Sequence, residues 1–171
     1  IELKLVNLIR ERVKEWREAD WPGVTRTTFE LLKYWRREGR EHRLFFAQLE
    51  AAGTILFLTA GRSDLSQGID IPWDDVSPER VDDGFAAFRR YACKMATGTG
   101  KTTVMGMLAA WSILNKLNNR SDGRFSDAVL VVCPNVTIRQ RLAELKPDLG
   151  EASIYRTRDL VPTHLMPLLT Q

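Results

Sequence analysis

The stretch KMATGTGKTT, residues 94–103, decides the fold that this sequence predicts. An apolar run, Tyr91-Ala92-Cys93, leads into it, and an amphipathic segment from Val104 to Leu117 follows it. Glycines in such a turn can adopt positive φ angles and bring the backbone close to an anion. The free N–H groups at the start of the following helix favour negative charge. Strand, glycine-rich turn and helix in this order therefore predict a phosphate-binding loop.

Each residue type in this loop has an expected task. Lys101 would reach the β- and γ-phosphates of a nucleotide, and the Thr102 hydroxyl would hold Mg²⁺, so we expect these two residues to carry the catalytic chemistry. Met95 stands where the general pattern has glycine, and a strict motif search rejects the stretch for that reason. The alternative is a glycine-rich turn that binds nothing. The predicted cofactor-binding residues of the loop are Thr97, Gly98, Thr99, Gly100, Lys101, Thr102 and Thr103.

Composition limits the class of protein. The 171 residues are 44% apolar and 27% charged, which is typical of a soluble globular domain. No run approaches the roughly 20 apolar residues of a membrane span, and no secretory leader is visible. Cys93 and Cys133 are expected to be reduced, buried strand residues, as in a cytoplasmic protein. We expect His42 and His164 to be surface or structural residues. The net charge of +3 permits a polyanionic partner without requiring one.

The first part of the chain predicts helices. Apolar residues recur at helical spacing over residues 1–18. A second helix is expected near Thr27, because Thr27 and Glu30 have the spacing of a capping box, and Gly39 is its expected stop. The apolar segment 44–59 suits a buried helix.

The second part of the chain predicts an α/β fold. Residues 60–84 are expected to form a long surface connection, and the spacing over residues 104–117 predicts a helix. The apolar, β-branched run 128–133 is typical of a central parallel strand, and residues 137–146 predict the next helix. Strand, helix, strand and helix together predict a parallel sheet flanked by helices. The tail from Pro147 has no clear periodicity.

Two of these segments, residues 94–102 and 130–137, resemble motifs of the first motor domain of superfamily 2 helicases. The similarity is strongest to the helicase-like restriction (res) subunits of type III (and type I) restriction enzymes, in which Met-Ala-Thr-Gly often precedes the lysine. Upstream, FFAQLEA at residues 45–51 resembles the Q motif of the same group. The resemblance implies a P-loop NTPase (RecA-like) α/β fold that is incomplete. It divides the chain into an N-terminal helical extension, 1–42, and a partial ATP-binding motor domain, 43–171.

The resemblance also implies further site residues. Gln48 would read adenine, because an amide can both donate and accept a hydrogen bond; the alternative is a partly buried polar residue in an apolar helix. The segment after the second strand matches motif Ia, which touches the nucleic-acid backbone in this family; the alternative is an ordinary strand-to-helix cap. Both loops are expected on one rim of the sheet. The implied nucleic-acid-binding residues are Pro134, Asn135, Thr137 and Arg139.

The resemblance implies an ATP-dependent helicase or translocase that uses ATP and Mg²⁺ as cofactors. Its expected partner is DNA, although the sequence does not distinguish DNA from RNA. No Asp-Glu dipeptide follows the loop, so the chain is expected to be the N-terminal portion of a motor and not to hydrolyse ATP by itself. A second motor domain, a nuclease domain and a modification or specificity subunit are expected partners, and no membrane is expected. Two alternatives stay open: a P-loop kinase or nucleotidase unrelated to nucleic acid, and a non-catalytic, nucleotide-gated assembly module.

Overall fold

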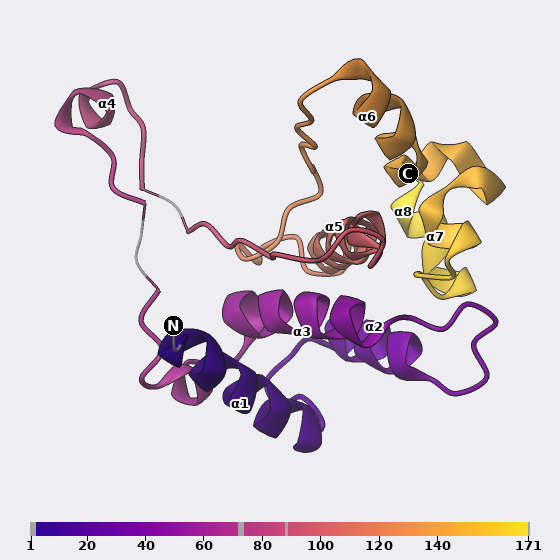
Figure 1. The fold of residues 1–171 in the computed structure, drawn as a ribbon, viewed down its shortest axis with the longest axis horizontal. Helices are drawn as coiled ribbons and strands as arrows, with labels where there is room; N and C mark the ends of the chain where they lie inside the picture. Colours follow the sequence, from indigo (N-terminus) through magenta and orange to yellow (C-terminus); the bar gives the residue numbers. More distant parts are fainter. Residues whose placement is uncertain (1–2, 72–73, 88, 171) are drawn as a thin grey trace.

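The structure is a computed structural model that describes residues 3–71, 74–87 and 89–170. Its long helices are α1 (Lys4–Glu18), α2 (Arg26–Arg36), α3 (Phe46–Ala60) and α5 (Lys101–Asn118). Figure 1 shows α5 next to α2, α3 and the C-terminal turns, whereas α4 stands apart from the other helices. The shorter elements are η1 (Ser63–Ser66), α4 (Pro78–Asp82), α6 (Val136–Arg141), η2 (Leu142–Leu145), η3 (Pro147–Ala152), α7 (Ile154–Thr157), η4 (Thr163–Leu165) and α8 (Met166–Leu169).

The N-terminal helices form where the apolar spacing predicts them, although their ends differ. The first two residues of the expected helix 1–18 lie outside the described residues. Helix α2 is capped by Thr25, whose hydroxyl oxygen accepts a hydrogen bond from the Thr28 N–H at 3.0 Å. Thr27 is instead buried inside the helix, so the predicted Thr27–Glu30 capping box is wrong. The helix also ends at Arg36, before the expected stop at Gly39.

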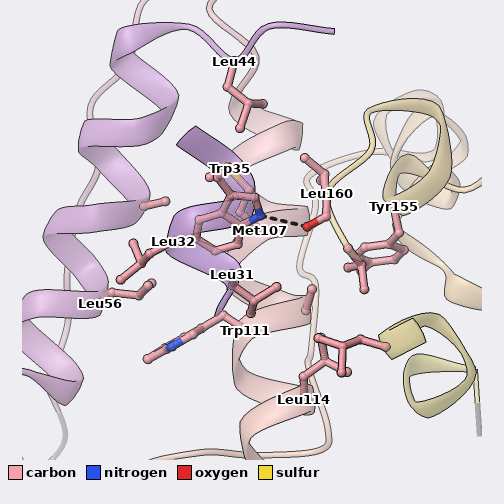
Figure 2. Close-up of a cluster of buried hydrophobic side chains, with 14 of the residues drawn as sticks. Leu31, Leu32, Trp35, Leu44, Leu56, Met107, Trp111, Leu114, Tyr155 and Leu160 are labelled. Carbon is pink, nitrogen blue, oxygen red and sulfur yellow. Dashed lines mark hydrogen bonds between the residues drawn. The ribbon is translucent and has the colours of Figure 1, made fainter. Parts of the chain in front are cut away.

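Helix α5 lies at the centre of one apolar core. Figure 2 shows Met107, Trp111 and Leu114 of α5 among side chains from α2, α3 and the tail. Met107 and Leu114 are fully buried, and so is Leu56 of α3. Burying a side chain of this size stabilises the fold by about 1.5–3 kcal/mol. The core therefore fixes the position of α5, whose first residue is Lys101.

Polar side chains inside this core satisfy one another. Asn115 of α5 is fully buried, and its Oδ1 accepts hydrogen bonds from the hydroxyls of Thr25 and Thr28. The Asn115 amide donates to the Trp111 carbonyl at 2.8 Å, and the Trp111 indole donates to the Thr28 hydroxyl at 3.0 Å. A buried polar group is costly unless it is hydrogen-bonded. This network consequently ties the start of α2 to the last turns of α5.

The tail after Pro147 belongs to the core, although its sequence shows no periodicity. Tyr155 and Leu160 are almost completely buried, and the Trp35 indole donates a hydrogen bond to the Leu160 carbonyl at 2.8 Å (Figure 2). Burial raises the pKa of Tyr155 to about 12, and its hydroxyl donates to the Leu145 carbonyl. Short turns thus bury isolated apolar residues where no long amphipathic helix exists.

The predicted parallel sheet is wrong, because the described ranges contain helices and turns but no β-strand. Both expected strands, 91–93 and 128–133, run without helical or strand structure, and Leu130 and Val132 are 88% and 83% exposed. The N–H and C=O groups of a strand must pair with a neighbouring strand, and in the part of the chain that the structure describes neither run has one. Cys93 is exposed and Cys133 half-buried, so the expectation of two buried strand cysteines is also wrong.

Candidate nucleotide-binding site

The glycine-rich loop has the backbone geometry of an anion cradle. Gly98 and Gly100 both adopt left-handed φ angles, 82° and 80°. The Thr99 hydroxyl donates to the Ala96 carbonyl at 2.7 Å and closes the turn. Helix α5 begins directly afterwards, and its N-cap residue, Gly100, has no side chain to cap the first N–H groups. An anion at this helix end would meet free donors and the positive end of the helix dipole.

Lys101 lies exposed across the mouth of the loop. Its ammonium donates hydrogen bonds to the Met95 carbonyl at 3.0 Å and the Ala96 carbonyl at 2.8 Å. Both acceptors are neutral carbonyls, whereas a phosphate oxygen carries negative charge and attracts the ammonium by Coulomb's law as well. A phosphate oxygen would therefore compete effectively with these carbonyls for the ammonium.

The threonines of the loop fall into different environments. Thr97 is exposed, Thr99 and Thr102 are half-buried, and Thr103 is buried at 6% exposure. A Cβ placed on Gly100 would lie 3.4 Å from the Thr103 hydroxyl, so Thr103 lies beside that glycine. Thr102 is thus the helix-start hydroxyl with solvent access, and Thr103 belongs to the packing under the loop.

Gln48 of α3 meets the loop, although the two positions are 52 residues apart in the sequence. The side chain is 5% exposed, and its Oε1 accepts a hydrogen bond from the Phe45 N–H at 2.8 Å. A Cβ at Gly100 would come within 2.0 Å of the Gln48 Nε2 atom. Gln48 therefore ties the start of α3 to the loop, and a side chain at position 100 would have to displace the Gln48 amide.

The residues matched to motif Ia are exposed at the start of α6. The Asn135 Oδ1 accepts a hydrogen bond from the Ile138 N–H at 2.9 Å and caps the helix. Pro134, Thr137 and Arg139 are all exposed. An apolar cavity of about 930 Å³ separates α5 from the segment that carries α6. Its lining includes Met105, Leu108, Val131, Val136 and Leu142.

The arginine cluster near residue 40 is engaged within the protein. Arg37 pairs with Asp159, and Arg36 lies 3.8 Å from the Glu50 carboxylate. The Arg40 side chain is 3% exposed and donates to the carbonyls of Arg158 and Asp159 at 2.9 Å. Burial lowers the pKa of Arg40, with a further lowering from Arg37. Arg37 and Arg40 consequently join the end of α2 to the tail, and Arg36 joins α2 to α3.

The fit to Mg²⁺ rests on Thr102. The residues that the structure describes hold no group of three or more histidine, cysteine or acidic side chains able to bind a metal ion. Mg²⁺ in nucleotide sites is usually held by one or two carboxylates together with substrate phosphates. Of the ligands expected for Mg²⁺ in such a site, the loop offers the Thr102 hydroxyl, and phosphate oxygens would come from the nucleotide.

The comparisons with known proteins identify the family. The family described as "Type III restriction enzyme, res subunit" matches residues 44–153, which include both Gln48 and the loop. The chain belongs to this family, a helicase-like class of enzyme that uses ATP, and the resemblance noted from the sequence is confirmed. No curated protein and no solved structure matches the chain. Among the described helices, none is long and apolar enough to cross a membrane.

Proposed function

We propose that this chain binds ATP with Mg²⁺ through residues 97–103 and serves an ATP-driven DNA translocase or helicase, the restriction subunit of a type III-like system. The observation that carries the proposal is the geometry of the loop. Gly98 and Gly100 open the backbone in the left-handed region, and Lys101 begins an 18-residue helix. Membership of the res-subunit family supports ATP as the nucleotide and nucleic acid as the substrate.

Within this proposal the chain binds and orients the nucleotide. Lys101 leaves the carbonyls of Met95 and Ala96 to pair with the β- and γ-phosphates, and the N–H groups of the first turn of α5 hold the remaining oxygens. Mg²⁺, when bound beside Thr102, neutralises phosphate charge. Because no Asp-Glu pair follows the loop in the sequence, this chain alone binds ATP without turning it over.

Calorimetric titration of the chain with ATP and Mg²⁺ tests nucleotide binding. Lys101→Ala should abolish the heat of binding, because it removes the charged partner of the phosphates. Lys14→Ala removes the same charge from an exposed position on α1 and should bind as the unmodified chain does. Equal binding by both variants would contradict the proposal.

Nucleic-acid binding is assigned to the start of α6. Thr137 and Arg139 are exposed beside the capped helix start, where hydroxyl and guanidinium groups can contact phosphates. Arg139→Ala should weaken binding of a DNA oligonucleotide and lower the slope of log K against log salt by about one. Arg120→Ala, which removes an exposed arginine after α5, is the matched control.

DNA-stimulated ATP turnover by the protein that carries this domain would distinguish a motor from a nucleotidase whose rate does not depend on DNA.

A further inference from the structure

Residues 74–87, which we call the arm, carry apolar side chains into solvent. The arm contains α4, which Figure 1 shows apart from the other helices. Val81 and Phe85 are 54% and 58% exposed and lie four positions apart, about one helical turn. The Arg80 guanidinium lies over the Phe85 ring, 5.7 Å from its centroid. Exposure of such side chains to water is unfavourable, so the arm presents an apolar surface for a partner to cover.

The arm is also strongly acidic. It contains five carboxylates and one guanidinium. Asp74 pairs with Arg90 at 2.5 Å. The four other carboxylates are exposed, and they belong to Asp75, Glu79, Asp82 and Asp83. A surface of this sign repels polyanions and attracts positive surfaces, so the partner of the arm is expected to be basic.

The cavity between α5 and the segment that carries α6 has the opposite charge. Arg139 and Lys146 line it and are both exposed, whereas none of the described residues in its lining is acidic. Its walls are mainly apolar, and two of them, Val132 and Val136, are 83% and 66% exposed. A volume of about 930 Å³ is large enough for a drug-sized ligand. The cavity therefore has room for two apolar side chains beside positive groups.

We propose that the arm of one copy of this chain docks in the cavity of a second copy, with its carboxylates facing Arg139 and Lys146. Apolar burial supplies the attraction, and the opposite charges set the orientation. A second copy is the partner because one chain carries both complementary surfaces. Two different surfaces meet in this contact, so it is heterologous and can continue from copy to copy. The proposal is independent of nucleotide binding.

Sedimentation velocity over a wide range of protein concentration tests the role of the arm. The average mass of the unmodified chain should rise with concentration. Val81→Ser/Phe85→Ser should weaken this association about tenfold, because it removes the apolar anchors. Leu5→Ser/Val6→Ser replaces another exposed apolar pair, 41% and 40% exposed on α1, and should leave the association unchanged. Circular dichroism checks that each variant keeps its helices.

A charge reversal tests the complementarity. Lys146→Glu should weaken the association, and the loss should shrink at high salt, where charges are screened. Lys14→Glu reverses the same charge at an exposed position on α1 and serves as the control. An equal effect of the two reversals would overturn the pairing of the acidic arm with the basic cavity.

Mixing two defective variants tests the head-to-tail geometry. Val132→Asp/Val136→Asp places carboxylates in the cavity and leaves the arm intact, whereas Val81→Ser/Phe85→Ser does the reverse. Each variant alone should associate weakly. An equal mixture should form a dimer and no larger species, because one intact arm then meets one intact cavity.

Three results would overturn the proposal. The first is an unmodified chain that stays monomeric at every concentration. The second is undiminished association of the arm variant, which would show that the copies meet through another surface. The third is a constant monomeric mass with a larger hydrodynamic radius for the arm variant, which would show that the arm closes on the cavity of its own chain.

Discussion

Two regions of this protein, which we call the helical body and the extended runs, differ in how their backbone N–H and C=O groups are hydrogen-bonded. We define the helical body as α1, α2, α3, α5 and the tail 147–170, and the extended runs as residues 89–97 and 127–135. The body buries Trp16, Trp35, Leu56 and Leu114 almost completely, whereas Leu130 in one run is 88% exposed. A helix pairs its own N–H and C=O groups, but a strand depends on a neighbour. Apolar sequence alone therefore builds the body, whereas within the described residues the two runs form no β-strand.

The largest expected effect comes from truncating the same residue type in the two regions. Leu114→Ala in the body should lower the free energy of unfolding by about 2–5 kcal/mol, because it leaves a cavity in the core. Leu130→Ala in the extended run should change it by less than about 0.5 kcal/mol. Urea unfolding followed by circular dichroism measures both. Similar losses for the two variants would show that the run is packed in solution and would erase the contrast.

A second pair of substitutions examines the loop, where an extended run meets the body. Gly100→Ala should destabilise the fold by about 1–3 kcal/mol, because it strains a left-handed residue and drives a Cβ against Gln48. Gly98→Ala has the same left-handed φ but no atom within 4 Å of its added Cβ. Its loss should be smaller, and thermal unfolding compares the two. Adding Gln48→Ala should recover part of the loss of Gly100→Ala and none of the loss of Gly98→Ala.

The smallest expected effect concerns the ion pairs that join α2 to the tail. Burial by itself raises the pKa of Asp159, but hydrogen bonds from Tyr34 and Arg37 outweigh it and hold the pKa below its usual 3.8. The stabilisation from this carboxylate is therefore present above pH 3.8 and is lost as the pH falls through the lower folded-state value.

Asp159→Asn measures that contribution. The variant should lose a fraction of a kcal/mol at neutral pH, since partly exposed ion pairs contribute about 0.2–1 kcal/mol. The gap between the two proteins should close in acid, which unfolding curves from pH 7 to pH 2 would show. Asp64→Asn, at an exposed pair with Arg62, is the control for a local surface interaction. A gap that is constant with pH would assign the loss to packing.

The sequence predicts what is local and misses what depends on distant neighbours. Helices α3 and α5 follow from apolar spacing and composition over 15 and 18 residues, and the left-handed glycines follow from the loop motif. Pairing of residues 128–133 depends on another strand, which the run itself does not specify. Thr25 caps α2 in place of Thr27 because Thr28 and Asn115 both bond to its hydroxyl, and Asn115 lies 90 positions away.

The candidate site divides in the same way. The motif predicts the positions of Gly98, Gly100 and Lys101 within the loop, since their conformations are set by adjacent residues. The contact between Gln48 and Gly100 joins two separate helices, and only the packed core brings them together. The missed burial of Tyr155 has a similar cause, because a single turn shows no period in the sequence.

Helix α5 connects the glycine-rich loop to the N-terminal helices. Eighteen residues of α-helix form a rod about 27 Å long, with Lys101 near one end and the Asn115 network near the other. A ligand that stabilises the first turn of α5 would also affect the contact of Thr25 with Asn115, because α5 is packed along its length between these two points. Occupancy of the loop and the melting of α1 and α2 would then be linked, and tryptophan fluorescence, to which Trp16 and Trp35 contribute, would report on this link.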